Sequence, residues 1–171
     1  MRIVNTNGLE EFTWSSPGGK FGGAGKEISE ALGRKPESTD LLERHPFDIE
    51  ITRLAPGQTI CPYHSHSMQW EFYHVISGSG AVRHAGGTTA IVPGDAFIFK
   101  PGEPHTLSND GAGDLVLYVV ADNPIGESTH FPDSGKWGVS SPERRLIRSE
   151  SLDYLDGEDD VLLRIGGDGV C

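Results

Sequence analysis

The sequence has few cysteines, few cationic residues and no long apolar run, and each shortage excludes a class of protein. Two cysteines in 171 residues are too few for a disulfide framework. Acidic residues outnumber Lys and Arg by 25 to 14, which argues against a nucleic-acid or acidic membrane surface. No apolar stretch approaches membrane-spanning length, and the first residues lack the basic start and apolar run of a secretory signal. We therefore expect a cytoplasmic protein with no nucleic-acid or membrane partner.

Turn-forming residues, by contrast, are abundant. The 23 glycines and 11 prolines favour many short strands over long helices. The length suits one domain, residues 1–171, with a core of its own. The negative charge is concentrated at the end, because residues 149–171 carry seven acids against Arg164 alone. We expect this acidic tail to form a solvated face or a partly disordered end.

A regular strand pattern begins at residue 47. Phe47, Ile49 and Ile51 alternate with polar residues, the period of a half-buried strand. Short β-rich runs broken by Gly and Pro turns follow, and about eight such strands indicate an all-β sandwich or barrel. The predicted strands after the first cover residues 62–67, 71–77, 81–84, 88–92, 96–100, 105–108 and 115–121.

The flanking segments have weaker patterns. We expect an N-terminal arm at 1–46 and a C-terminal arm with the acidic tail at 122–171, around a barrel core at about 47–121. The remaining predictions are an edge strand at 2–4, a glycine-rich loop at 15–25, a short helix at 26–33, turn residues with isolated aromatics at 129–137, an edge strand at 144–148, and an apolar patch at 161–165 that packs back on the body.

Three potential metal ligands lie close together near the centre of the chain. His64 and His66 are two residues apart, so on a strand they project from one side. If the chain turns at 67–70 and returns as a second strand, Glu71 rejoins them. Two imidazoles and a carboxylate that converge suit a borderline divalent ion. Alternatively, Glu71 hydrogen-bonds a histidine instead of binding metal, or the whole set is a cluster of ordinary polar residues.

A fourth candidate ligand comes from a distant segment. His105 follows a Gly-Pro-rich turn and opens a strand. In an antiparallel barrel, segments some thirty to forty residues apart can face each other across the interior. His105 is therefore the candidate that completes the set.

The two histidine segments resemble the two motifs of the cupin superfamily. The first motif corresponds to Gly57, His64, His66, Glu71 and Gly78, with the first gap one residue longer than usual. The second corresponds to Gly94, Lys100, Gly102, His105 and Asn109, with Lys100 at the usual proline. The segments FGGAGK at 21–26, HFPDSGKW at 130–137 and LDYLDGE at 152–158 further resemble a bacterial group of single-domain cupins, whose members are often named as sugar-phosphate isomerases on fold-level analogy.

The resemblance implies a double-stranded β-helix, the cupin jelly-roll barrel, with short N- and C-terminal arms. It also implies one divalent metal (Fe, Mn, Zn, Ni or Co) held by His64, His66, Glu71 and His105. We expect an isomerase- or epimerase-like enzyme that acts on a small polar substrate such as a sugar or sugar phosphate. The alternatives are an Fe(II)-dependent dioxygenase and a non-catalytic cupin that binds a small molecule.

Several residues near these motifs have two interpretations. Glu71 and Tyr73 share a strand face, so both are candidates for proton transfer, although Tyr73 is equally well explained as a barrel aromatic. Cys61 is interpreted as packing, and Arg53 and Lys100 as solvated cations rather than anion contacts. Because such barrels leave edge strands, we expect a homodimer. Aromatic and thioether side chains that could line a pocket are Met68, Trp70, Phe97, Phe99 and Trp137.

Overall fold

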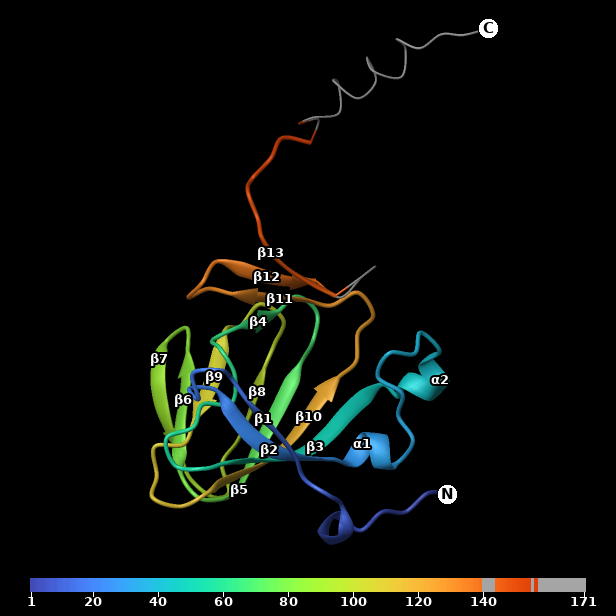
Figure 1. Ribbon diagram of the computed structural model, residues 1–171, viewed down its shortest axis with the longest axis vertical. Coiled ribbons are helices and arrows are strands. Elements are labelled where there is room, and N and C mark those ends of the chain that lie inside the picture. Colours follow the sequence, from blue (N-terminus) through green and yellow to red (C-terminus); the bar gives the residue numbers. More distant parts are fainter. Residues whose placement is uncertain (140–143, 155, 157–171) are drawn as a thin grey trace, which may run out of the picture.

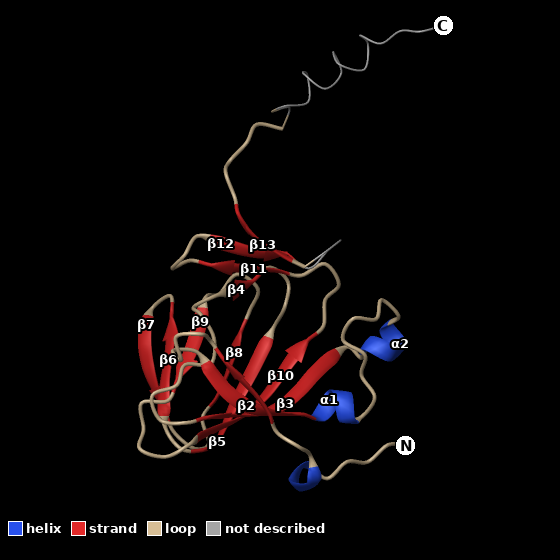
Figure 2. Cartoon of the chain, in the orientation of Figure 1, coloured by secondary structure: helices blue, strands red, loops and turns tan. Residues whose placement is uncertain are grey.

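The computed structural model describes residues 1–139, 144–154 and 156, and these fold mainly into strands (Figure 2). Three short helical segments lie outside the sheets: a 3₁₀ turn at Thr6–Gly8, α1 (Ile28–Ala31) and α2 (Leu41–Arg44). The strands are β1 (Phe12–Ser15), β2 (Gly22–Glu27), β3 (Phe47–Leu54), β4 (Ser65–His66), β5 (Glu71–Ser77), β6 (Gly80–His84), β7 (Gly87–Ile91), β8 (Ala96–Phe99), β9 (His105–Ser108), β10 (Leu115–Asp122), β11 (Ser128–Phe131), β12 (Lys136–Val139) and β13 (Arg145–Arg148).

The strands form three antiparallel sheets. A six-stranded sheet has the order β1-β2-β3-β10-β5-β8, and a three-stranded sheet has the order β7-β6-β9. The apolar core lies between them, because its buried side chains come from both. A four-stranded sheet, β13-β12-β11-β4, lies across one end of this barrel (Figure 1). The predicted all-β jelly-roll barrel is confirmed.

The core is built from inward-facing side chains of the predicted strands. On β10, Leu115, Leu117 and Val119 are buried at alternate positions, as a period of two requires. On β3 the buried positions are Thr52 and Leu54. Ile49 and Ile51 are therefore on the opposite face of that strand, and α1 lies against β3. The expected short helix at 26–33 is confirmed as α1.

The predicted loop at 15–25 is confirmed between β1 and β2 but wrong from residue 22 on, because residues 22–27 form strand β2 between β1 and β3. The reason is the pairing of glycines with aromatic rings. Gly23 pairs with Trp14 and Gly25 with Phe12, and a Cβ at either glycine would lie within 2.7 Å of the partner ring. Aromatic side chains on β1 thus cover the glycines and supply the packing that β2 itself lacks.

The C-terminal arm also holds more structure than expected. Residues predicted as turns at 129–137 form the β11–β12 hairpin, in which His130 pairs with Trp137 and stacks on it at 4.4 Å between ring centroids. The expected edge strand at 144–148 is confirmed as β13, whereas residues 2–4 form no strand. The apolar patch at 161–165 lies outside the described residues. The division into a core at 47–121 and two arms stays a prediction; β1 and β2 of the N-terminal arm extend the largest sheet.

Within the described part of the chain, no helix has the length and apolar character that crossing a membrane requires.

Candidate metal centre

The two histidine segments meet through their backbones. His64 and His105 exchange hydrogen bonds, N–H of His64 to the carbonyl of His105 at 3.1 Å and the reverse at 2.8 Å. The turn before β9 is tied to the same place, because the N–H of Gly102 donates to the carbonyl of His66 at 2.7 Å. Gly102 has a φ of +83°, a conformation that favours glycine. Lys100 at the usual proline position does not prevent this turn, since Glu103 N–H still donates to its carbonyl at 3.0 Å.

The side chains of the predicted set converge inside the barrel. Nε2 of His64 lies 3.0 Å from Nε2 of His66, so the prediction that they share one side is confirmed. Glu71 opens β5 after the bend at 67–70, and its Oε2 lies 3.5 Å from His66 Nε2. The ligand atoms of these three residues all lie within 4.8 Å of one another. His105 is not a member of that set, but its Nε2 lies 2.7 Å from Glu71 Oε2.

Backbone carbonyls determine which nitrogen of two of the histidines carries the proton. Nδ1 of His64 lies 3.0 Å from the carbonyl oxygen of Pro62, and Nδ1 of His105 lies 3.1 Å from that of Glu103. A carbonyl oxygen only accepts, so each Nδ1 carries a hydrogen, and Nε2 is the nitrogen left to coordinate a cation. The proton that Nε2 of His105 shares with Glu71 at 2.7 Å would leave when a cation binds. Both Nε2 atoms face the other members of the cluster. The donor set therefore fits a divalent ion bound through Nε2 atoms and a carboxylate.

The surroundings hold two members of the cluster, His64 and Glu71, in the protonation states that metal binding needs. Burial lowers the pKa of His64 to about 4, an effect that the negative charge of Glu71 only partly offsets. Burial acts to raise the pKa of Glu71, but the hydrogen bond from His105 and the charges of the three imidazoles together lower it to about 2. A neutral imidazole and an ionised carboxylate are the forms that coordinate a cation.

Two groups beside the cluster, the Tyr73 hydroxyl and the Cys61 thiol, keep their protons at neutral pH. Burial and the charge of Glu71 raise the pKa of Tyr73 well above its usual value, and its hydroxyl lies 3.4 Å from Glu71 Oε2 as a donor. Burial raises the pKa of the Cys61 thiol to about 12, with Sγ 3.4 Å from His64 Nδ1. The thiol is therefore protonated at neutral pH, in agreement with the interpretation of Cys61 as packing.

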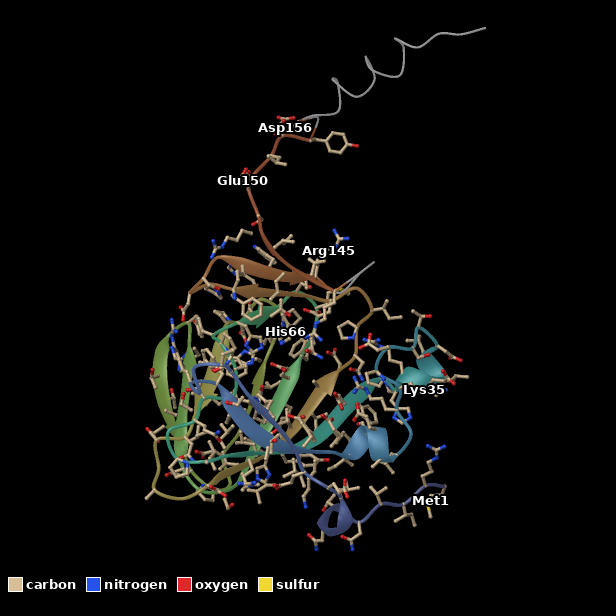
Figure 3. All side chains as sticks on the ribbon, in the orientation of Figure 1. Met1, Lys35, His66, Arg145, Glu150 and Asp156 are labelled. Atoms are coloured by element: carbon tan, nitrogen blue, oxygen red, sulfur yellow. The ribbon has the colours of Figure 1, made fainter. Side chains whose placement is uncertain are left out.

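The C-terminal hairpin covers the cluster, and it brings a residue that the sequence did not indicate. His66, on β4, lies beneath β11 and β12 in Figure 3, and β4 pairs with β11. Glu127, just before β11, has its Oε1 3.4 Å from His66 Nδ1. Phe131 stacks on His64 with ring centroids 6.2 Å apart. Glu127 is an isolated acid 56 positions after Glu71, so no spacing rule could have linked it to the histidines.

A cavity of about 520 Å³ lies between β6, β7 and β8. Phe97 and Phe99 line it, as expected of pocket aromatics, and the ring of Phe99 also stacks on His105. Met68 and Trp70 are largely exposed instead. The other lining residues are Val82, His84, Thr89, Ala90, Ile91, Asp95 and Ala96. Arg53 and Lys100 are not among them; Arg53 instead pairs with Glu11 and Asp114 at 2.7 and 3.1 Å.

Comparison with known proteins agrees with this architecture. Residues 50–121 match the family described as Cupin domain. A curated protein of Thermotoga maritima named as an oxalate-binding protein is 31% identical over 68 residues. That match covers 40% of this chain and 55% of the relative, so the chain spans about half of that protein's length.

Solved structures extend the similarity to most of the chain. One is a protein of Acidithiobacillus ferrooxidans that is named as a proposed sugar phosphate isomerase. It has a TM-score of 0.73 at 20% identity, and the similarity covers 88% of this chain and 96% of that protein. A sugar phosphate isomerase from a cupin superfamily, of Silicibacter pomeroyi, has a TM-score of 0.72 at 20% identity, over 90% of this chain and 98% of its own. At this identity the likeness concerns the fold. Residues 50–121 thus match a cupin domain by sequence, and most of the chain shares the fold of these two solved structures.

Proposed function

We propose that this cupin binds one divalent transition metal through His64, His66, Glu71 and His105 and acts on a small polar substrate as an isomerase- or epimerase-like enzyme. The observation that carries the proposal is the pair of backbone carbonyls that accept from Nδ1 of His64 and of His105 and so turn the Nε2 atoms of both residues into the cluster. A bound metal would polarise a substrate oxygen or lower the pKa of a bound water. Mixed imidazole and carboxylate ligation suits Fe, Mn, Zn, Ni or Co.

The chain's own residues limit how protons are handled beside the metal. Glu71, with its pKa near 2, is ionised at neutral pH, so it can bind a cation or accept a proton but has none to give. Tyr73, with a raised pKa, keeps its proton and donates it as a hydrogen bond. An isomerase of this kind would therefore use Glu71 as the acceptor only if it is not fully engaged in ligation.

A sugar or sugar phosphate substrate is supported by the names of the two structural neighbours. A second candidate is an Fe(II)-dependent dioxygenase on an aromatic compound, and it is supported by the cavity that lies behind Phe99, on the other side of that ring from His105. Phenyl rings of Phe97 and Phe99 form part of its lining, and none of its nine lining residues is Lys or Arg. A phosphate group would therefore find no cationic side chain there.

Elemental analysis of protein purified without chelator tests the metal site. We expect about one metal ion per chain in the wild type and none retained by His105→Ala. His84→Ala is the matched control, because His84 pairs with His105 across β6 and β9 but hydrogen-bonds Thr89 instead of the cluster. That variant should keep the metal. Wild-type protein that neither holds metal nor binds it on addition would contradict the proposal.

Activity assays then separate the candidate functions. Oxygen-independent turnover of sugars or sugar phosphates with Mn or Zn bound supports the isomerase. Iron as the native metal, with oxygen uptake on a phenolic substrate, supports the dioxygenase. A His105→Ala protein that loses metal yet keeps its affinity for a small ligand would indicate a non-catalytic binding protein. Thermal-shift screening of sugar phosphates, hydroxy acids and phenols supplies the ligands for these assays.

A further inference from the structure

Glu127 connects the C-terminal hairpin to the strand that carries His66. Its Oε1 accepts hydrogen bonds from the backbone N–H of Ser67 at 2.7 Å and from the Ser67 hydroxyl at 3.3 Å. Its Oε2 accepts from the N–H of Met68 at 3.0 Å. The side chain is only 14% exposed. The carboxylate is thus held by residues that directly follow His66, and its position relative to the imidazole is well defined.

His66 differs from the other two histidines in what its Nδ1 faces. Nδ1 of His64 and of His105 each face a backbone carbonyl. Nδ1 of His66 is buried and has no hydrogen-bond partner in the part of the chain that the structure describes. The carboxylate oxygen Oε1 of Glu127 lies 3.4 Å away, close enough for an ion pair but outside hydrogen-bond geometry.

The tautomer of His66 decides whether it can bind a metal through the nitrogen that faces the cluster. Its Nε2 lies 3.0 Å from His64 Nε2, and His64 is already protonated on Nδ1. In the metal-free protein the proton of His66 is therefore drawn to Nε2, where it can be donated to His64. A carboxylate at Nδ1 opposes this by stabilising the Nδ1–H form, which leaves Nε2 free as a ligand.

We propose that Glu127 is a positioning residue of the metal centre, holding His66 in the Nδ1–H form with Nε2 directed at the cluster. The inference rests on the proposed function of the site. It assigns part of the centre to a segment outside residues 50–121, the region that matches the Cupin domain. It also gives the β11–β12 hairpin a role besides covering the site.

A purely structural role is the competing explanation, because Glu127 also anchors Ser67 and Met68. Glu127→Gln separates the two, since the amide keeps the size of the side chain and one acceptor oxygen but lacks the charge. Two control variants keep the carboxylate of Glu127. Ser67→Ala removes only the hydroxyl contacts, and Asp133→Asn breaks the exposed pair of 2.6 and 2.8 Å between Arg83 and the hairpin turn.

Two measurements on the full chain decide the question. The first is Co²⁺ affinity by chelator competition, with the visible absorption of the bound ion. We expect Glu127→Gln to bind Co²⁺ about 10- to 100-fold more weakly with an altered spectrum, and both controls to stay within about 3-fold of wild type. The second is the tautomer of His66 from ¹⁵N NMR of metal-free protein, where we expect Glu127→Gln to lose Nδ1–H population.

Each outcome bears on one proposal. Unchanged affinity, spectrum and tautomer in Glu127→Gln would overturn the role of Glu127. So would an equal loss of affinity in both control variants, which would show that hairpin integrity alone matters. If wild-type protein binds no Co²⁺, the proposed function fails, whereas the tautomer measurement still tests Glu127 in the metal-free protein.

Discussion

The ring of Phe99 lies parallel to the imidazole of His105, with the two ring centroids 3.8 Å apart. Phe99 also lines the cavity between β6, β7 and β8. One aromatic ring therefore both restricts the orientation of His105 and separates that histidine from the cavity. His105 itself is 1% exposed.

Replacing Phe99 with Leu should loosen His105 without emptying the site. Loss of the stacked ring removes about 0.5–1.5 kcal/mol of aromatic contact in addition to buried area. We expect a thermal midpoint a few degrees lower and metal affinity reduced several-fold, because the imidazole can rotate away. Calorimetry and metal titration measure the two effects. Phe97→Leu is the control. Phe97 lies two residues before Phe99 on β8 and stacks on Tyr73 at 5.5 Å, so its replacement should lower stability but leave metal affinity unchanged.

Acid should destabilise the metal-free protein in two overlapping steps. His64 has a folded-state pKa of about 4, below the usual 6.5, so its contribution is present above pH 6.5 and is lost as the pH falls to 4. Glu71 has a folded-state pKa of about 2, below the usual 4.5, so its contribution is lost between pH 4.5 and 2. Urea unfolding at pH 7, 5.5 and 4 measures the decline. His64→Gln should flatten it between pH 6.5 and 4, and an equally steep decline in that variant would contradict this assignment.

Glu27 should have the opposite pH dependence. Burial and the nearby charges of Glu50 and Glu30 raise its pKa to about 8. The folded state therefore holds a proton that the unfolded chain has released, and stability falls as the pH rises from 4.5 to 8. Because the carboxyl of Glu27 is partly solvated, Glu27→Gln should raise the free energy of unfolding at pH 8 by only about 1 kcal/mol, which corresponds to about 2–4 °C in the thermal midpoint.

The matched control for that prediction is Glu43→Gln. Glu43 is partly exposed and its bond to Lys35 lowers its pKa, so this change should not stabilise the protein at pH 8. Arg34 already pairs with Glu30 and Asp48 beside Glu27. A gain at pH 8 that equals the gain at pH 4 would show that the effect of Glu27→Gln is not electrostatic.

Tyr73→Phe should leave the metal in place. The hydroxyl makes a long contact of 3.4 Å with Glu71, and removing such a bond costs about 1 kcal/mol. Since the phenol keeps its proton at neutral pH, we expect turnover to fall by less than about tenfold. Metal analysis and steady-state kinetics on the same preparation test this. A loss of a thousandfold or more at full metal content would instead identify Tyr73 as a proton donor to substrate.

The expected homodimer is tested by light scattering on a gel-filtration column. Among the described strands, β1 and β8 each have one edge of the six-stranded sheet without a neighbour, and Ile98 on β8 is 51% exposed. Covering such an edge is a common reason for self-association. We expect twice the 18.5 kDa chain mass, shifted toward the monomer by Ile98→Lys. Wild-type protein that elutes as a monomer at all concentrations contradicts the prediction.

Short-range patterns accounted for most of the barrel and for the identity of the clustered residues. Strands at 71–77 and 105–108 could be predicted because turn residues bound each run of β-formers, and turn chemistry acts locally. His64 and His66 share a side because a strand alternates faces, and the bend before Glu71 returns the chain to them.

What lies beyond the reach of sequence was decided by contacts between distant segments. The strand at Gly22–Glu27 exists because rings of β1 cover its glycines, and local propensity carries no information about such a cover. The buried side of β3 is set by what packs on it and not by its alternation. Glu127 reaches His66 only through the pairing of β4 with β11, a register between residues some sixty positions apart. The residue types of the cluster were thus readable from the chain, whereas the groups that orient them depend on tertiary packing.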